Sequence, residues 1–281
     1  MKYRSVLPLI AISLFTMVPF VTAQKLGAQE IIAKHLDSIG TAEKRSAFKS
    51  IVVSGEVDVD YISQKRQPTS GRIVIATEGR KMFVGMNLNT PEYPQERFVF
   101  DGDKSAIGMV NRGGRSTLGN FIQSNTIIMS HGLLSGTLGS SWLFLNAADD
   151  KGKISTAGTK KIDGRETYGL SYSPKGGSDI EIKLYFDQET FRHVRTEYSA
   201  TRSAAMGRTI DESARNRETR MKLVEDFGEF KESGGLMMPS KYRIFYSYTG
   251  QNETSEQAWN CVISEFAVNQ KLDAGSFSTG E

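Results

Sequence analysis

The sequence has 281 residues, of which 24% are charged and 38% hydrophobic, and its formal net charge is +3. This modest charge gives no bulk electrostatic argument for binding to nucleic acid or to an anionic membrane. Cys261 is the only cysteine. A single cysteine excludes an intrachain disulfide and most cysteine-based metal sites.

The first residues have the pattern of a cleavable secretory signal. Lys2 and Arg4 precede an uncharged, mainly apolar run that ends in small or modest side chains at Ala23. This pattern predicts export and cleavage after Ala23, so that residues 1–23 are a signal peptide and residues 24–281 a single mature domain. The alternative is an uncleaved membrane anchor, but a span needs about 20 apolar residues and two prolines interrupt this run. Without a cysteine near the cleavage site, no lipidated N-terminus is expected.

Residues 28–39 are expected to form a helix. One face is formed by the residues that recur at three- and four-residue spacing, Ala28, Ile31, Ile32, His35, Leu36 and Ile39, and Gly40 follows as a stop signal. His35 lies at the edge of this apolar face. A histidine in that position is more often packed in a core than used as a ligand, and we expect the packed role.

From residue 51 onward the apolar period changes to two, which is typical of half-buried strands. The short runs are separated by turn signals such as Asp101-Gly102 and Gly234-Gly235. The pattern predicts one long antiparallel meander. The expected strands are 51–60, 71–77, 81–88, 97–100, 105–110, 153–157, 165–172, 179–186, 191–198, 217–231, 240–248 and 259–266, with residues 200–220 as a loop or loosely held strand ends.

Between residues 118 and 148 the alternation stops. This stretch is the most apolar part of the predicted mature chain, and four glycines interrupt it. We expect two or three short helices here. They either close a hydrophobic core or act as a movable cover over an apolar concave sheet face, because ligand pockets are concave and mainly apolar.

Residues that could carry catalysis or bind metal are few. The three histidines lack Cys, His or carboxylate partners at metal-ligand spacing, so no metal site is predicted. Asp58 and Asp60 alternate with valines and are expected on a solvent-exposed face. Cys261 is expected to be a small buried residue. A hydrolase would require His131 or His193 to meet a serine and a carboxylate in space, and we predict that the protein is not an enzyme and has no cofactor.

Three stretches resemble the LolA/LolB-like superfamily of periplasmic lipoprotein carriers and outer-membrane lipoprotein-sorting proteins. Residues 184–194 look like its strand–turn–strand, with Asp187 before the turn. Residues 227–246 look like its hairpin, in which Gly234-Gly235 is followed by apolar residues and Pro239. Residues 266–277 look like its closing strand and final phenylalanine.

The resemblance implies a mainly β (α+β) fold. A strongly curved antiparallel sheet would form an incomplete β-barrel, with an N-terminal amphipathic helix and short helices covering the hollow face. It does not place the family's functional arginine, for which Arg72, Arg80 and Arg97 are all candidates. The middle stretch and residues 200–220 are also longer than a minimal carrier needs.

The same resemblance implies a monomeric periplasmic carrier or binding protein for lipid or lipoprotein acyl chains, held without covalent chemistry. The alternative is a non-catalytic structural or interaction module of the envelope with a filled core. Neither a nucleic-acid partner nor a transmembrane segment is expected, and an envelope protein is a candidate partner besides the lipid or acylated protein. The candidate ligand-binding residues are Leu118, Phe121, Ile122, Ile127, Ile128, Leu133, Leu134, Leu138, Trp142 and Phe144.

Overall fold

The computed structural model describes residues 26–110, 112–146, 152–204, 209, 217–251 and 253–279. The predicted signal peptide lies outside these residues, as do 205–208 and 210–216 of the predicted 200–220 loop. Among the described residues, no helix has the length and apolar character needed to span a bilayer.

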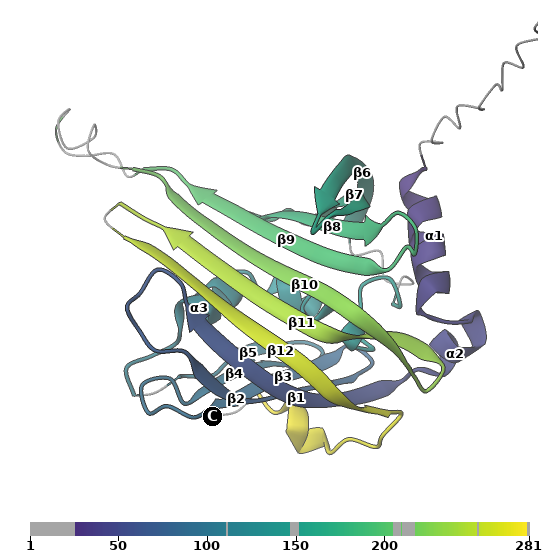
Figure 1. Ribbon diagram of the computed structural model, residues 1–281, viewed down its shortest axis with the longest axis horizontal. Coiled ribbons are helices and arrows are strands. Elements are labelled where there is room, and N and C mark those ends of the chain that lie inside the picture. The colour runs from purple at the N-terminus through teal and green to yellow at the C-terminus, as the bar shows by residue number, and fades with distance from the viewer. Residues whose placement is uncertain are drawn as a thin grey trace, which may run out of the picture.

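One antiparallel sheet of 12 strands makes up most of the structure, and its spatial order is β5-β4-β3-β2-β1-β12-β11-β10-β9-β8-β7-β6. The first and last strands therefore pair at the centre of the sheet (Figure 1). The strands are β1 (Ser50–Tyr61), β2 (Thr69–Glu78), β3 (Lys81–Leu88), β4 (Gln95–Phe100), β5 (Ser105–Ile107), β6 (Gly152–Ile162), β7 (Arg165–Pro174), β8 (Glu181–Asp187), β9 (His193–Arg202), β10 (Thr219–Ser233), β11 (Leu236–Thr249) and β12 (Thr254–Val268).

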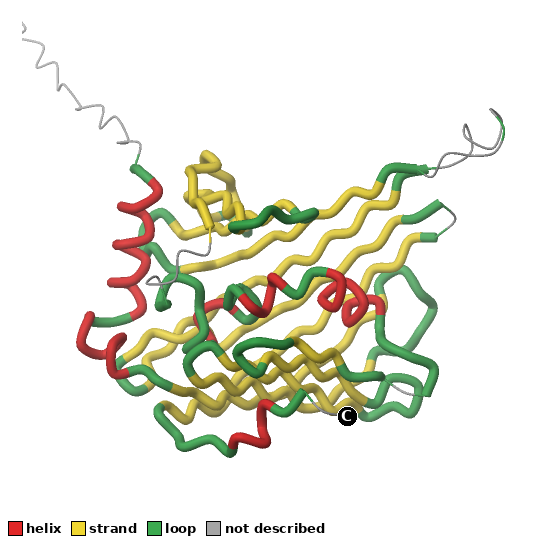
Figure 2. Tube along the Cα trace, turned by 180° about the vertical axis from the view of Figure 1, so that it is seen from behind, coloured by secondary structure: helices red, strands yellow, loops and turns green. Residues whose placement is uncertain are grey.

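The sheet is strongly curved and not closed, which confirms the predicted half-barrel. Strands β5 and β6 follow each other in the chain but lie at opposite edges of the sheet. The segment between them therefore crosses the open side, and its helices lie over the concave face (Figure 2). These elements are α3 (Thr117–Ser124), α4 (Ile127–Ser130) and the 3-10 turn η1 (Gly136–Leu138). They correspond to the two or three short helices predicted.

The alternation seen in the sequence decides which side chains face the hollow. On β1, Val57 and Val59 are buried, Asp58 is exposed and Asp60 is half-buried. Asp58 and Asp60 therefore lie on the convex face, as predicted. The concave side chains form one continuous apolar core with the crossing segment, whereas Ile162, Tyr185 and Val194 form a small separate cluster.

The remaining helices lie at the ends of the chain. Helix α1 (Ala28–Ile39) has the predicted bounds, and Ile31, Ile32, His35 and Ile39 are buried. A second helix, α2 (Ala42–Ala47), was not predicted, and it begins where the Thr41 hydroxyl accepts a hydrogen bond from the Lys44 N–H. The 3-10 turn η2 (Ala274–Phe277) follows the last strand.

Candidate functional site

Residues 118–145, called the insert below, cover the middle of the concave face. Of the ten candidate ligand-binding residues, Ile127 is partly buried and the other nine are buried. Their side chains belong to the same core cluster as the sheet. The structure thus brings the candidates together over the hollow, and they act in this conformation as core residues.

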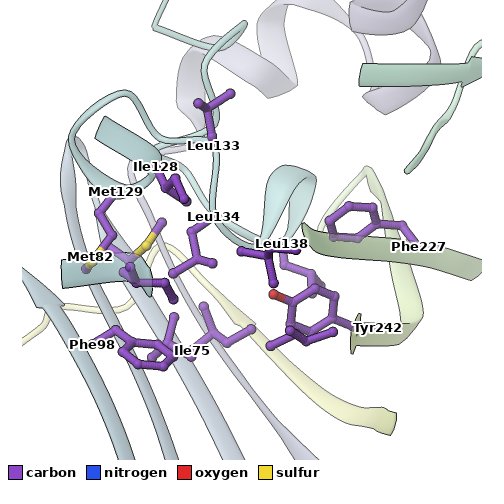
Figure 3. Close-up of a cluster of buried hydrophobic side chains, with 14 of the residues drawn as sticks. Ile75, Met82, Phe98, Ile128, Met129, Leu133, Leu134, Leu138, Phe227 and Tyr242 are labelled. Carbon is purple, nitrogen blue, oxygen red and sulfur yellow. The ribbon is translucent and has the colours of Figure 1, made fainter. Parts of the chain in front are cut away.

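The space beneath the insert is packed with side chains. Leu134 and Leu138 point from the insert toward Ile75 and Tyr242 of the sheet, whereas Leu133 points away from them (Figure 3). Two of the insert's glycines are explained by close approaches, one to the sheet and one within the insert itself. A Cβ on Gly136 would lie 2.8 Å from Phe227 Cζ, and one on Gly132 would lie 1.7 Å from the Ser141 carbonyl oxygen. An acyl chain can occupy this part of the hollow only if the insert moves away.

A buried carboxyl group holds η1 to the sheet. Glu225 on β10 is 0% exposed and accepts hydrogen bonds from the Ser135 N–H at 2.7 Å, the Tyr242 hydroxyl at 2.5 Å and the Tyr198 hydroxyl at 2.8 Å. Burial raises the pKa of Glu225 to about 7, and the hydrogen bonds from Tyr242, Ser135 and Tyr198 oppose that rise.

A second polar contact joins the insert to α1. The Trp142 indole N–H donates to His35 Nε2 at 3.0 Å, and His35 Nδ1 lies 3.0 Å from the Phe191 carbonyl oxygen. Burial lowers the pKa of His35 to about 4, so the ring is neutral at pH 7. The neutral ring can accept from Trp142 while it donates to Phe191. His35 therefore has the packed role predicted for it.

His193 on β9 extends this cluster. Its ring stacks on Trp142 with centroids 4.6 Å apart, and its Nε2 lies 2.9 Å from Thr196 Oγ1. Burial lowers the pKa of His193 well below its usual value, with a further decrease caused by His35. His131, in the insert, lies with Nδ1 2.5 Å from the Tyr172 hydroxyl. The two histidines considered for a hydrolase thus pack against different parts of the core.

The packed arrangement also leaves polar atoms unpaired. Ser140 is held by Thr77, whose Oγ1 accepts from its N–H at 2.8 Å. In contrast, Thr137 Oγ1, Ser141 Oγ and His193 Nδ1 are buried without a hydrogen-bond partner among the described residues. An unsatisfied buried polar group costs about 1–3 kcal/mol. Covering the hollow therefore carries a polar cost that the apolar contacts offset.

One part of the concave face is left open beside α3. The rim hollow, as it is called below, has a volume of about 310 Å³. Met221, Tyr246 and Tyr248 form its sheet side and Phe121 part of its helix side, and the rest of its lining is polar or charged, including Arg202 and Glu253. The rings of Phe121 and Tyr246 lie 5.4 Å apart, and burial raises the pKa of Tyr246 to about 12. The volume lies at the lower end of the range of about 300–1,000 Å³ that is usual for ligand pockets.

A larger hollow of about 420 Å³ lies on the opposite, convex face. Its lining combines apolar Val194 and Val262 with charged Asp226, Lys241 and Arg243. Asp226 is paired there with Arg243 at 3.3 Å and with Arg195 at 2.5 Å. This convex hollow lies away from the insert, whereas the rim hollow lies next to it on the concave face.

The three candidate arginines lie away from the concave face. Arg72 and Arg80 are exposed, and Arg97 is half-buried with its guanidinium donating to the Ser278 carbonyl oxygen at 2.8 Å. Cys261 is buried, as predicted. In the described part of the chain, no group of three or more His, Cys, Asp or Glu side chains is placed to hold a metal ion. The sequence analysis did not identify Glu225. It lies two residues from both Leu223 and Phe227 on the same strand, so it occupies a position where an apolar side chain is expected.

No protein-family model matches the sequence, and neither does any curated protein. Solved structures do match. A LolA superfamily protein from Nitrosomonas europaea is 15% identical with a TM-score of 0.48, and the match covers 90% of this chain and 98% of that one. A DUF1329 family protein from Desulfovibrio piger is 12% identical with a TM-score of 0.46, covering 89% and 96%.

A third structure is that of a protein domain from Vibrio parahaemolyticus, assigned to outer membrane lipoprotein sorting. It is 11% identical with a TM-score of 0.44, and the match covers 88% of this chain and 97% of that one. The solved structures that this chain is similar to thus include the LolA-like group whose fold was predicted from the three sequence stretches.

Proposed function

We propose that this protein is a periplasmic carrier or binding protein that holds an acyl chain of a lipid or lipoprotein on the concave face of its sheet. The chain enters at the rim hollow and the insert moves aside to extend it. The observation that carries this proposal is the rim hollow itself, which lies beside α3 on the concave face and has Phe121, Met221, Tyr246 and Tyr248 as apolar walls.

The rim hollow is continuous with the insert through Phe121. This residue lines the hollow and is also part of the core cluster that the insert shares with the sheet. Movement of α3 away from Tyr246 would therefore lengthen the hollow toward Ile122 and Leu118, which are buried behind it. The ten candidate ligand-binding residues would then line the path of an acyl chain.

The energetics fit reversible binding. Burying apolar surface is worth about 25 cal/mol per Å², but the insert already covers this face. An entering acyl chain therefore replaces the insert's contacts rather than filling empty space, and only the difference contributes to affinity. The unpaired Thr137, Ser141 and His193 atoms lower the cost of displacing the insert. A carrier that must release its cargo benefits from such a balance.

The test is binding of a fluorescent fatty acid to the mature protein, together with lipid analysis of the protein as purified. Met221→Glu replaces one of the few apolar walls of the rim hollow with a hydrated carboxyl group, and we expect it to weaken binding of the acyl chain by at least about tenfold. Val262→Glu introduces the same charge at an exposed position of the convex face and serves as the matched control. A wild-type protein that is purified empty and binds no probe would contradict the proposal.

A second function is favoured by the packed interior beneath the insert. In it the insert is a permanent part of the core, and the protein is a structural or interaction module of the envelope. This alternative predicts no probe binding by the wild-type protein, together with specific capture of one envelope protein. Probe binding that Met221→Glu abolishes and Val262→Glu preserves would contradict it.

A further inference from the structure

Glu225 is the one carboxyl group among the concave-facing residues of β10, where it lies between buried Leu223 and Phe227. Placing an ionisable group at this position is costly unless it is well hydrogen-bonded. Its three donors come from three different elements: Tyr198 from β9, Tyr242 from β11 and Ser135 from the insert. The two tyrosines fix the carboxyl group, and Ser135 is the part that moves if the insert is displaced.

The contact with Ser135 is made at a strained point of the insert. Ser135 has a φ of 64°, in the left-handed region that non-glycine residues seldom adopt. It is the residue immediately before η1, and the strained conformation directs its N–H toward Glu225. Such strain persists only where surrounding contacts hold it in place. Loss of the Glu225 contact would therefore favour release of Ser135 and of the η1 turn that follows it.

We infer that Glu225 is a positioning residue that controls displacement of the insert, with its protonated carboxyl group favouring the covered state and its ionised form favouring exposure of the concave face. This inference rests on the proposed function, since displacement of the insert is the step that would admit an acyl chain. The inference means that pH regulates access to the concave face, which opens more readily at alkaline than at acidic pH.

The direction follows from proton linkage. In the covered state burial raises the pKa of Glu225 to about 7, whereas exposure to water would return it toward its usual value of 4.5. The covered state therefore binds more protons between these two values. Covering is favoured at pH values below about 7 and is weakened as the pH rises through 7. With these two pKa values, the equilibrium constant for opening increases about tenfold between pH 6 and pH 8.

The other titratable groups around Glu225 do not change charge in this range. Burial raises the pKa values of Tyr198 and Tyr242 well above their usual value, so both hydroxyls stay neutral. Burial lowers the pKa values of His193 and His35, which also stay neutral. The negative charge of Asp226, on the opposite face, adds to the rise in the pKa of Glu225.

Cys261 provides a reporter of opening without any added label site. It is the only cysteine of the chain, is 3% exposed and pairs with Tyr242 across β11 and β12. Paired residues of adjacent strands point to the same face, so its thiol lies on the concave face beside the Glu225 cluster. Burial also raises the pKa of the Cys261 thiol, so it reacts slowly while the face is covered.

The experiment measures the rate at which an uncharged maleimide modifies Cys261 in the ligand-free protein, relative to the unfolded protein at the same pH. We expect the relative rate of the wild-type protein to increase about tenfold from pH 6 to pH 8, as linkage predicts. Hydrogen exchange of residues 133–143 should increase in parallel while that of β10 and β11 does not. Equal increases throughout the sheet would show global unfolding instead and would overturn the inference.

Variants separate ionisation from hydrogen bonding. Glu225→Gln keeps an acceptor for the Ser135 N–H but cannot ionise, and we expect a flat pH profile. Glu96→Gln is the control for a second buried carboxyl group, because burial also raises the pKa of Glu96 to about 7 while its hydrogen bonds are with Ser116 and Tyr93 and not with Ser135. It should keep the tenfold increase. A Glu225→Gln protein with the wild-type profile would overturn the inference.

Glu225→Leu removes the acceptor altogether, and we expect faster modification of Cys261 at both pH values. A folded Glu225→Leu protein with wild-type rates would count against the inference, and if this variant does not fold, the Glu225→Gln profile decides. The fatty-acid assay separates this result from the proposed function. A Glu225-dependent pH profile without probe binding supports the positioning role of Glu225 and contradicts acyl-chain binding. Probe binding with a flat pH profile supports acyl-chain binding and contradicts the positioning role.

Discussion

Glu225 and Asp226 are neighbours on β10 that lie in opposite environments. Glu225 is 0% exposed on the concave face and is bonded by neutral hydroxyl and N–H donors. The Asp226 side chain is 18% exposed on the convex face and lies between the guanidinium groups of Arg195 and Arg243. Two adjacent residues of one strand thus differ in role, because the Glu225 carboxyl group can titrate near neutral pH while the Asp226 carboxylate belongs to a network of ion pairs.

The difference shows how this sheet divides its tasks. The convex face carries alternating charges, in which Asp163, Arg195, Asp226 and Arg243 follow one another across the β6–β7 turn and strands β9 to β11. Water and opposite charges stabilise that face without the insert. The concave face has neither, so its stability depends on what covers it. Changes on the concave face should therefore have large effects and changes on the convex face small ones.

The largest effect is expected for Trp142→Ala. The indole is fully buried, donates to His35 and stacks on His193, and its removal leaves a cavity and an unpaired imidazole nitrogen. Loss of a buried Trp typically costs about 3–5 kcal/mol. Urea denaturation measures the change in the free energy of unfolding. The convex control is Val262→Ala, at a side chain that is 54% exposed, and it should change that free energy by no more than about 0.5 kcal/mol.

A Trp142→Ala cost as small as that of Val262→Ala would show that the insert is not part of the cooperative core. The comparison between the two faces would then fail. Separate denaturation transitions for the insert and the sheet would sharpen it, because they would identify the insert as the part of the concave core that is released first.

A smaller effect is expected in the pH dependence of stability. The pKa of Glu225 is raised to about 7 in the folded protein from a usual value of 4.5. Its stabilising contribution is therefore fully present below about pH 4.5 and is lost as the pH rises through 7. Between pH 6 and pH 8 this loss is about 1.4 kcal/mol in the free energy of unfolding. Glu96, with the same pKa, should contribute a similar loss.

Urea denaturation at the two pH values checks this expectation in the wild-type protein and in Glu225→Gln and Glu96→Gln. Each single variant should remove about half of the pH dependence, and the double variant should remove nearly all of it, because the two carboxyl groups have different hydrogen-bond partners and their effects should add. If Asp226→Asn removed as much of the pH dependence as Glu225→Gln, the assignment of the titration to the concave face would be wrong.

Sequence patterns predicted the helix and the strands well because these elements depend on local periodicity, whereas the open half-barrel was implied by the family resemblance. The period of 3.6 predicted α1 at its observed bounds, and the period of two predicted the strands on both sides of the insert. Strand β5 is shorter than expected, since pairing ends at Ile107, and β12 is longer, since it begins at Thr254. Helix α2 was missed because a helix of six residues has too few turns to show a period.

The site was predicted only in part, because its polar contacts join distant parts of the chain. The apolar residues of the insert were visible as a break in the alternation. The Ser135–Glu225 contact spans 90 positions, and the Trp142–His35 contact spans 107. No spacing rule connects residues so far apart. Glu225 nonetheless left a local signal, because a glutamate at the apolar parity of a strand must find hydrogen-bond donors inside the protein.

The smallest effect is expected for Asp226→Asn on the convex face. This change removes the charge that pairs with Arg195 and Arg243 but keeps the size of the side chain. Because the pair is partly exposed, we expect a loss of about 0.2–1 kcal/mol in the free energy of unfolding, and a smaller loss in 1 M salt, where the screening length falls to about 3 Å. Urea denaturation at low and high salt measures both values. Asp58→Asn, at an exposed carboxylate of the same face, is the matched control and should change the free energy of unfolding little.

A loss above about 2 kcal/mol that does not respond to salt would mean that Asp226 behaves as a buried carboxylate. The two faces of β10 would then be alike in their energetics, and the convex hollow beside Asp226 would become the better candidate for a binding site.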